Sequence, residues 1–347
     1  MAVALIAAGV GLAAAVGCRS PRGSDAHRPG PATQGADQRP APPTPEGVVR
    51  IATYNTALSG DSPDAMVDAL ANPESTQPQR IASVLRIVRP DIVLLQEFDH
   101  RPSSGAPALF RRHFLSEPKD GRDALSYAHS LYPEVNTGVA SGHDLDGNGR
   151  TVTTPQSRGY AGDALGWGKY PGHYGMLVLS RHPIASEDVR SFRSFEWRRM
   201  PNNSMPEGFY TEAERAMLPL SSKTHLDVPI VIDGRRLHLL ISHPTPPAFD
   251  GPADRNGRRN RDEIRFWADY LGGTTSERGG YMVDEEGRRG GLDRTAPFVL
   301  LGDLNADPND SADRARGAIR TLLSHERVAD PRPAGPGGRH AAQRQGG

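Results

Sequence analysis

The chain has 347 residues, which is enough for one large domain or two of ordinary size. Its 41 basic and 41 acidic residues cancel, so outside any local patch there is no basic excess of the kind that marks a nucleic-acid-binding protein. Cys18 is the single cysteine, which excludes an intrachain disulfide. The 38 glycines and 31 prolines indicate long loops.

An apolar run of small residues occupies positions 3–17 and ends at Cys18. It is shorter than a membrane-spanning helix requires, and it resembles the hydrophobic region of an export signal. Residues 15–18 (Ala-Val-Gly-Cys) resemble a bacterial lipobox, in which the cysteine is lipidated, although no basic residue precedes the run. We therefore expect a signal over 1–18 and an exported protein. It is either a cell-envelope lipoprotein anchored to the membrane through Cys18, or a protein secreted after plain cleavage.

Two terminal segments have compositions that do not support folding. Residues 19–47 are rich in Pro, Gly, Ala, Gln and charged side chains, with almost no large apolar residue. Residues 330–347 are similarly rich in Pro, Gly, Arg and Gln. Such segments cannot bury enough apolar surface to fold. We expect a disordered tether over 19–47, a folded domain over 48–329 and a disordered tail over 330–347.

The folded part begins with a strand, a helix and a second strand. Residues 49–55 alternate between apolar and polar and predict a strand that ends on Asn55. Residues 80–88 carry apolar side chains at helical spacing and stop before a proline. Residues 91–97 predict a buried strand that ends on Glu97. This order is typical of an α/β fold.

Residues 100–170 are polar and rich in glycine, and we expect them to form a large surface insertion. Inside it, oxygen-bearing side chains alternate at Asp144, Asp146 and Asn148, with Gly149 at the sixth position. This spacing resembles the first half of a calcium-binding EF-hand loop. The twelfth position is proline where glutamate is expected, and no flanking helices are evident. The segment is either a turn-rich loop or a weak Ca²⁺ site.

The middle of the chain continues the same pattern of strands and loops. Residues 174–181 predict a strand, and residues 182–222 predict loops whose aromatic side chains pack against the sheet. Residues 229–243 predict a hairpin, because an Asp-Gly pair separates two runs of strand-forming residues. The second strand of this hairpin ends at His243, before two prolines, and an amphipathic helix is expected over 262–271.

A late apolar run, residues 298–301 (Phe-Val-Leu-Leu), predicts a buried strand between a proline and a glycine. Asp303 and Asn305 follow at alternate positions, so in an extended segment their side chains point the same way. A carboxylate and an amide at the same place can together bind a metal ion and the phosphate attached to it. Taken alone, the stretch fits equally well a turn that caps the helix expected over 311–323.

Four predicted strands thus end in a polar functional group, which is the pattern that points to a family. In chain order these groups are Asn55, Glu97 after a glutamine, His243 after a serine, and Asp303 with Asn305 in the sequence Gly-Asp-Leu-Asn. The order resembles the endonuclease/exonuclease/phosphatase superfamily of deoxyribonuclease I-like metal-dependent phosphoesterases. The resemblance covers about residues 48–323.

The resemblance implies a fold and a cofactor. The fold is α/β, a four-layer α-β-β-α sandwich in which two sheets face each other with helices outside. The cofactor is a divalent cation, Mg²⁺ or Mn²⁺, bound by Glu97 with Asn55 close by. Carboxylate and amide oxygens are ligands that Mg²⁺ prefers.

The resemblance also implies catalytic roles in metal-assisted hydrolysis of a phosphate ester. Asp303 matches the aspartate that aligns or deprotonates the attacking water, and Asn305 the amide that helps to hold the transition state. His243 matches the histidine that hydrogen-bonds the scissile phosphate or assists the leaving group. Tyr174 matches a tyrosine that faces the phosphate.

One expected motif is absent from this sequence. The family carries an Asp-His pair in a final strand, and its histidine acts as a general base together with the aspartate that Asp303 matches. Here His325 and His340 follow, and neither is preceded by aspartate or by a strand. We expect the C-terminal strand or strands to be missing, the second sheet to have an uncovered edge, and hydrolysis to be impaired. The chain is then either incomplete or a degenerate member that serves as a surface or binding protein.

The substrate class stays open at this point. A phosphate ester in nucleic acid or in a phospholipid head group is expected, and zero net charge weakens the case for nucleic acid. An arginine-rich stretch after His243 either contacts phosphate or begins a solvated helix; it contains Arg255, Arg258, Arg259 and Arg261. We expect a monomer.

Overall fold

The structure is a computed structural model that describes residues 2–7, 41–42, 44–249, 251–274, 278–309 and 316–330. Its strands form two sheets. The first sheet contains, in spatial order, β1 (Ala2–Ala7), β2 (Val48–Asn55), β3 (Ile92–Gln96), β5 (Met176–Ser180) and β4 (His129–Leu131). The second contains β6 (Arg190–Ser191), β7 (His225–Ile232), β8 (Arg235–Ser242) and β9 (Phe298–Leu301).

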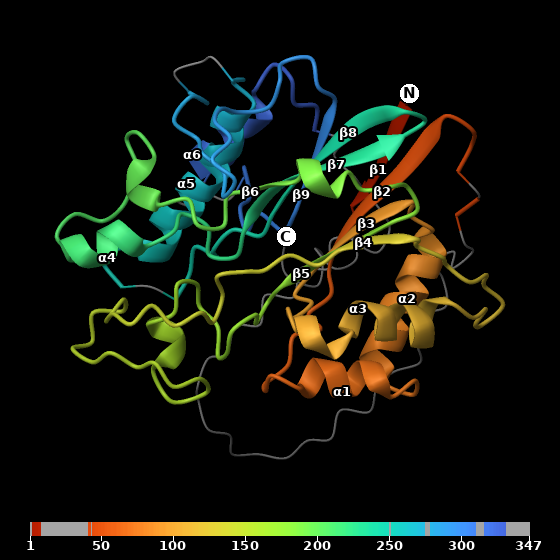
Figure 1. Cartoon of the computed structure of the whole chain (residues 1–347), viewed down its shortest axis with the longest axis horizontal. Helices are drawn as coiled ribbons and strands as arrows, with labels where there is room; N and C mark the ends of the chain where they lie inside the picture. The colour runs from red at the N-terminus through yellow and green to blue at the C-terminus, as the bar shows by residue number, and fades with distance from the viewer. Residues whose placement is uncertain are drawn as a thin grey trace.

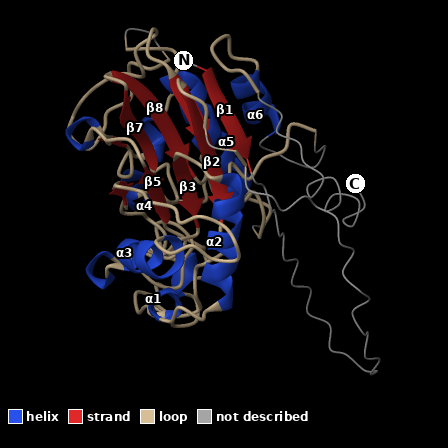
Figure 2. Ribbon diagram, turned by 90° about the vertical axis from the view of Figure 1, so that its right-hand side faces the viewer, coloured by secondary structure: helices blue, strands red, loops and turns tan. Residues whose placement is uncertain are grey.

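Helices lie on both sides of the two sheets. On one side are α1 (Ala65–Ala71), α2 (Thr76–Val88) and α3 (Ala106–Phe110), and α3 continues as a π turn over Arg111–Leu115. On the other side are α4 (Glu212–Met217), α5 (Arg255–Tyr270) and α6 (Arg316–Leu323). Figure 1 shows the two helix groups separated by the strands. Figure 2, turned by 90°, shows the strands gathered in one block with α1, α2 and α3 beside it.

Alternating apolar side chains on the strands build three cores between these layers. In β3, Ile92 and Leu94 point toward the second sheet, where they meet residues such as Leu239 of β8. Val93, between them, points the other way into the core shared with α1, α2 and α3. In β8, Leu240 points outward to the core formed with α5 and α6. The predicted four-layer sandwich is therefore confirmed.

Most of the predicted strands form where the sequence indicated. The hairpin of β7 and β8 turns at Asp233 and Gly234, which both have a positive φ, as a tight two-residue turn of this kind requires. The run 298–301 is β9 itself. Among the described residues β9 pairs with β8 alone, so its other side is the uncovered edge that the sequence predicts.

Two predictions about loops and helices need correction. Residues 100–170 are not a surface insertion: Phe110, Phe114 and Tyr127 are buried against the first sheet, and β4 pairs with β5. The elements there are too short to show a periodic apolar pattern. Helix α5 begins at Arg255 and not at 262, because its first turns bury polar side chains through hydrogen bonds that amphipathic spacing does not reveal.

The N-terminal segment contributes a strand. Ala2–Ala7 pairs in parallel with β2, in the register Ala2 opposite Val48, and forms the edge of the first sheet. The positions 8–40, which include Cys18 and most of the predicted tether, lie outside the described residues, as does the tail after 330. The leader and the lipid anchor therefore stay predictions.

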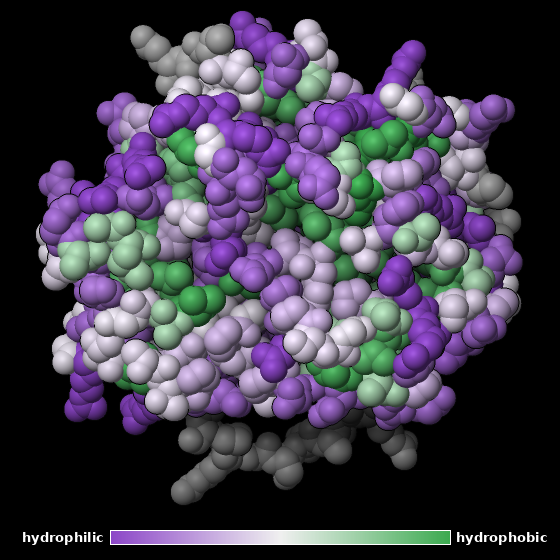
Figure 3. Space-filling model, in the orientation of Figure 1, coloured by the Kyte–Doolittle hydropathy of each residue, from purple (hydrophilic) through white to green (hydrophobic). Residues whose placement is uncertain are grey.

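No helix in the described part of the chain is both long enough and apolar enough to cross a membrane. On the face drawn in Figure 3, hydrophobic residues occur as separate patches among hydrophilic ones.

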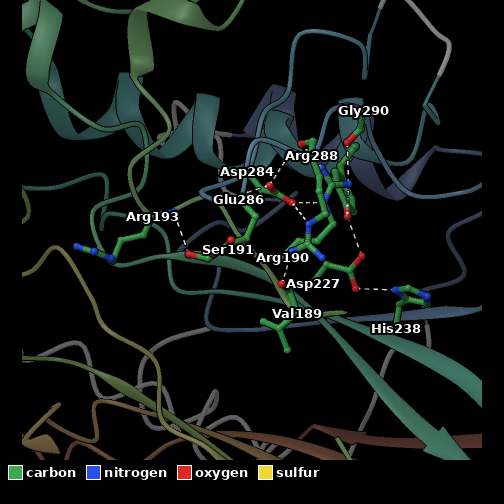
Figure 4. A network of polar contacts seen from close by, with 11 residues as sticks. Val189, Arg190, Ser191, Arg193, Asp227, His238, Asp284, Glu286, Arg288 and Gly290 are labelled. Carbon is green, nitrogen blue, oxygen red and sulfur yellow. Dashed lines mark hydrogen bonds and ion pairs between the residues drawn. The ribbon is translucent and has the colours of Figure 1, made fainter. Parts of the chain in front are cut away.

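A buried polar network ties a loop to the edge of the second sheet (Figure 4). Arg190 of β6 donates to Asp284 at 2.6 Å, to the carbonyl of Gly290 at 2.8 Å and to that of Arg288 at 2.8 Å. Burial alone would raise the pKa of Asp284, but the hydrogen bonds and charges of Arg190 and Arg288 bring that pKa below its usual value. The network therefore holds a loop of the fold, separately from the polar strand ends.

Candidate active site

The topology brings the four polar strand ends to one place. Strands β2 and β3 are parallel neighbours, so Asn55 and Glu97 leave the first sheet at the same end. Strands β8 and β9 are also parallel neighbours, so His243 and Asp303 leave the second sheet together. Because the sheets pack face to face, the two ends meet.

The Asn55 side chain joins the two sheets. Its Nδ2 donates to Glu97 Oε1 at 3.0 Å and to Asp303 Oδ2 at 3.1 Å. Its Oδ1 accepts from the backbone N–H of Ala57 at 3.1 Å. One amide nitrogen is therefore shared by two carboxylates that come from different sheets.

The loop after β9 is fixed by its own hydrogen bonds and by close packing. Asp303 Oδ1 accepts from the backbone N–H of Asn305 at 3.2 Å, and Asn305 Nδ2 donates to the carbonyl of Pro244 at 3.0 Å. A Cβ atom on Gly302 would lie 1.9 Å from the carbonyl oxygen of Ser242. Only glycine allows this approach, so the glycine before Asp303 is a packing requirement.

His243 is buried and neutral at physiological pH. Its Nε2 lies 4.0 Å from Asp303 Oδ2, beyond hydrogen-bond distance, and its Nδ1 has no hydrogen-bond partner among the described residues. Burial lowers the pKa of His243 well below its usual value; the charge of Lys223 lowers it further, and that of Asp303 opposes the change.

Asp303 is held in its ionised form. Burial would raise its pKa, but coupling to the His243 imidazole, which acts only when that ring is protonated, and the hydrogen bonds from Asn55 and Asn305 outweigh burial and bring the pKa below its usual value.

Three site residues have left-handed backbone conformations that non-glycine residues seldom adopt. The φ angles are 56° at Glu97, 56° at Tyr174 and 50° at Asn305. Each such residue costs on the order of 1 kcal/mol, and such residues concentrate at functional sites. At Glu97 this conformation ends β3 and turns the side chain out of the strand's alternation.

Tyr174 lies on the loop before β5, next to the acids. Its backbone N–H donates to the buried Asp99 at 2.8 Å, and its ring stacks on His173 at 3.7 Å and on Trp167 at 6.0 Å between centroids. Burial raises the pKa of Tyr174 to about 12, and the charge of Glu97 adds to this. The hydroxyl group is therefore protonated and can donate a hydrogen bond.

Helix α5 supplies two buried side chains that sequence reasoning missed. Glu263 accepts from the backbone N–H of Ser222 at 2.8 Å and from that of Thr245 at 2.6 Å. Asn260, one turn earlier, donates to the carbonyl of Thr245 at 2.7 Å and to that of Leu304 at 3.0 Å. Their signal in the sequence was a pair of polar residues three positions apart on an otherwise amphipathic helix.

Lys223 is a third residue that the sequence analysis did not single out. It immediately precedes the hairpin, and only 5% of it is exposed. Burial lowers its pKa, while the charges of Glu263, Glu97 and Asp303 act in the opposite direction.

The arginine-rich stretch serves the fold at two of its positions. Arg259 is buried and donates to the carbonyl of Leu220 at 2.8 Å, and Arg255 donates to that of Leu145 at 2.6 Å. These two side chains therefore bind backbone carbonyl groups of the protein and not phosphate.

The predicted calcium loop contains a cluster of three acids. One carboxylate oxygen from each of Asp144, Asp146 and Asp163 lies within 4.8 Å of the others. Asp163 comes from a later loop and was not predicted. The Asn148 side-chain oxygen accepts from the N–H of Arg150 at 2.9 Å, and its role as a ligand stays a prediction.

The strand-end site fits a divalent cation. Glu97 and Asp303 are carboxylates held close together by one nitrogen, which concentrates negative charge and offers hard oxygen ligands. Asn55 turns its nitrogen to the acids and its oxygen to Ala57. Asn55 could bind a metal ion through its oxygen only if its amide group flipped. Glu97 is therefore the ligand that this arrangement provides.

Comparison with known proteins places these features in a family. The model of the Endonuclease/Exonuclease/phosphatase family matches residues 52–346. No curated protein sequence matches the chain.

Three solved structures that are similar to this chain are distant from it in sequence. An endonuclease/exonuclease/phosphatase from Beutenbergia cavernae DSM 12333 is 20% identical with a TM-score of 0.40, over 76% of this chain and 49% of that one. The chain thus spans about half the length of that protein. Sphingomyelinase C from Streptomyces griseocarneus is 16% identical with a TM-score of 0.41, over 81% of this chain and 70% of that one. Beta toxin from Staphylococcus aureus with bound magnesium ions is 13% identical with a TM-score of 0.40, over 81% and 70%.

Proposed function

This chain belongs to the endonuclease/exonuclease/phosphatase family, and from that premise we propose that it is an exported, divalent-metal-dependent phosphoesterase. It hydrolyses a phosphodiester or phosphomonoester bond by metal-assisted attack of water. The observation that carries the proposal is the Asn55 amide, which joins Glu97 of one sheet to Asp303 of the other.

The proposed roles of Glu97 and Asp303 follow from the negative charge of their carboxylates. Glu97 would hold Mg²⁺ or Mn²⁺, and the bound cation supplies neutralisation of the phosphate charge. Asp303 is ionised and accepts a hydrogen bond, or the proton, from the attacking water.

The remaining site residues act as neutral hydrogen-bond partners of the phosphate. His243 is neutral, so it donates a hydrogen bond but does not deliver a proton as an imidazolium. Asn305 and the protonated Tyr174 hydroxyl are further donors to phosphate oxygens. One donor of Asn305 is already bonded to Pro244, which fixes the orientation of its amide.

We also propose that this polypeptide turns over slowly. In the part of the chain that the structure describes, the histidine that lies near Asp303 is His243. Its Nε2 is 4.0 Å from Asp303 Oδ2, and burial keeps its imidazole neutral. Among the described residues, Asp303 therefore has no hydrogen-bonded histidine to share the proton of the attacking water. The same observation supports the second candidate, a surface or binding protein that keeps the fold without catalysis.

Hydrolysis of bis-p-nitrophenyl phosphate with and without Mg²⁺ separates these proposals. The expected result is slow, Mg²⁺-dependent turnover that Asp303→Ala abolishes, with Asp188→Ala, at a half-exposed ion pair with Arg236, as the control. Robust turnover that depends on Asp303 would contradict the impairment. Absence of both turnover and Mg²⁺ binding would contradict the phosphoesterase. A panel of nucleic acids and phospholipid head groups then identifies the substrate class.

Export and anchoring form a separate proposal that rests on the leader sequence. The apolar run before Cys18 supports export, and the lipobox-like residues 15–18 support a lipid anchor in the cell envelope. Labelling with a radioactive fatty acid tests the anchor: incorporation into the parent protein and none into Cys18→Ser is the expected result. Equal labelling of both proteins would contradict it.

A weak Ca²⁺ site at Asp144, Asp146 and Asn148, with Asp163 beside them, is a proposal independent of catalysis. Asp146 supports it, since burial raises the pKa of Asp146 and the neighbouring charge of Asp163 adds to that rise. The expected result is a melting temperature that rises with Ca²⁺ in the parent and not in Asp144→Ala. A calcium effect that survives this substitution would contradict the site.

A further inference from the structure

We propose that Trp167 is a substrate-binding residue, whose exposed indole stacks on a nucleobase next to the phosphate site. The inference rests on the proposed phosphoesterase function and deepens it, because it names a nucleotide ester as the substrate class. A free nucleotide and a single-stranded nucleic acid both present this chemistry, a planar base joined to a phosphate through a sugar.

Trp167 is a large aromatic side chain that the fold leaves half open to solvent. It is 56% exposed, whereas the other two tryptophans of the chain, Trp197 and Trp267, are fully buried. Single exposed hydrophobic side chains are common on protein surfaces. Trp167 differs from them because its backbone is closely packed and its ring contacts a residue of the candidate active site.

Close contacts hold the backbone on both sides of Trp167. A Cβ atom on Gly166 would lie 2.0 Å from the carbonyl oxygen of Ser222. A Cβ atom on Gly168 would lie 2.6 Å from the backbone nitrogen of Gly138, and this nitrogen donates to the carbonyl of Gly166 at 2.8 Å. The indole therefore extends from a rigid loop, so little conformational freedom is lost when a ligand binds it.

Tyr174 connects the indole to the strand-end acids. The rings of Trp167 and Tyr174 are stacked, with centroids 6.0 Å apart and planes 30° from parallel. The N–H of Phe98 donates to the carbonyl of Gly175 at 3.1 Å, and this antiparallel pairing places Glu97 beside Tyr174. The indole is thus one aromatic ring away from the hydroxyl group proposed to donate to phosphate. In a nucleotide, one sugar ring separates the base from the phosphate.

The arrangement of the rings favours a planar ligand over a quaternary ammonium group. The ring of His173 lies 22° from parallel to that of Tyr174 and 35° from parallel to that of Trp167. Quaternary ammonium ligands are recognised in cages, where aromatic rings face the cation from several sides. Nearly parallel rings do not form such walls. The open face of the indole instead suits stacking on another flat ring.

The groups next to the indole carry no unpaired charge. Burial lowers the pKa of His173 to about 4, so its imidazole is neutral at physiological pH. Lys169 forms an ion pair with Asp61 at 2.6 Å. Stacking accepts any base, because every base has a π face. A substrate bound in this way does not require a strongly basic protein surface, which agrees with the zero net charge of the chain.

The test measures binding in the presence of Mg²⁺ and does not require turnover. Adenosine 5′-monophosphate (AMP) and ribose 5-phosphate differ only in the base, and calorimetry gives the affinity of each. The parent should bind AMP about tenfold more tightly than ribose 5-phosphate. Trp167→Ala should lose this preference and Trp167→Phe should keep part of it. Phe249→Ala, which removes a ring that is 90% exposed, is the control and should match the parent.

Tryptophan fluorescence adds a readout that a structural role would not change. Because Trp167 is the one exposed tryptophan of the three, AMP should quench the same part of the emission that acrylamide quenches. Ribose 5-phosphate should leave this emission unchanged. The melting temperature of Trp167→Ala should stay within about 2 °C of that of the parent, since the side chain is half exposed.

Several results would overturn the proposal. These are equal affinities of the parent for AMP and ribose 5-phosphate, a parent that binds no AMP, and a preference for AMP that survives in Trp167→Ala. A blue shift of the emission with phosphatidylcholine vesicles, without quenching by AMP, would also overturn it and would assign Trp167 to a membrane surface.

A single-stranded oligonucleotide distinguishes the two sources of the base. Binding that depends on Trp167 and is tighter than that of AMP supports a nucleic acid, and weaker binding supports a free nucleotide. The proposed hydrolysis can fail separately: if the parent binds AMP through Trp167 but hydrolyses no phosphate ester, the assignment of Trp167 stands. If the parent hydrolyses phosphate esters without a preference for a base, the assignment of Trp167 fails and the hydrolysis stands.

Discussion

Glu263→Gln is the substitution that best tests how the site is held together. Glu263 is fully buried, and its carboxylate accepts three hydrogen bonds: from Ser222 N at 2.8 Å, Ser222 Oγ at 3.1 Å and Thr245 N at 2.6 Å. Glutamine has nearly the same shape but replaces one oxygen with an NH₂ group. One backbone N–H must therefore face another donor.

The magnitude follows from these contacts. The amide nitrogen turns toward Ser222, because the Ser222 hydroxyl can rotate to accept from it, and the shorter bond to Thr245 survives. What is lost is one charge-assisted bond, and the Ser222 N–H is left buried and unsatisfied. Together these cost about 3 kcal/mol of unfolding free energy.

Urea unfolding followed by tryptophan fluorescence measures this loss, because Trp197 and Trp267 are both fully buried. The control is Glu212→Gln, whose side chain is 80% exposed and should change the unfolding free energy by less than about 0.5 kcal/mol. A loss below about 1 kcal/mol for Glu263→Gln would refute the reasoning that this carboxylate holds both loops.

Three further predictions follow from the structure. Glu97→Gln should weaken Mg²⁺ binding at least about tenfold in calorimetry, and unchanged affinity would remove Glu97 as a ligand. Burial lowers the pKa of His225 in the folded state, so the unfolded chain binds the extra proton and this contribution to stability is lost as pH falls below about 6.5. Its share is at most about 1.4 kcal/mol per pH unit in urea unfolding, and His225→Gln should make the slope below about pH 6.5 shallower. Asp284→Asn leaves the buried Arg190 without its counter-charge and should cost about 3 kcal/mol by the same assay, whereas a neutral result would contradict the importance of this network.

The sequence predicts the strand-end residues well because their position depends on local rules. An apolar run such as that of β9 forms a buried strand wherever it packs, and the residues after it leave the sheet at its end. Parallel pairing of β2 with β3 and of β8 with β9 then brings Asn55, Glu97, His243 and Asp303 together. Their order along the chain was enough to indicate both the fold and the family.

The supporting residues could not be predicted because their environment is created by distant parts of the chain. Glu263 lies in a helix whose polar residues are typical of a solvated face. It is nevertheless buried, and it accepts hydrogen bonds from two separate loops. Asp163 joins Asp144 only after the intervening loop folds back. Lys223 has no local signal at all, since a lysine before a strand is most often exposed.

The charges of the site suggest the order in which its ligands bind. Glu97 and Asp303 share one amide nitrogen, His243 is kept neutral by burial, and Lys223 is unpaired among the described residues. Before any ligand binds, the two acids outweigh the single lysine, so the site attracts a divalent cation and repels a phosphate ester. A bound cation would reverse this balance in favour of the anion. The same acids that would hold the cation therefore make phosphate binding depend on it.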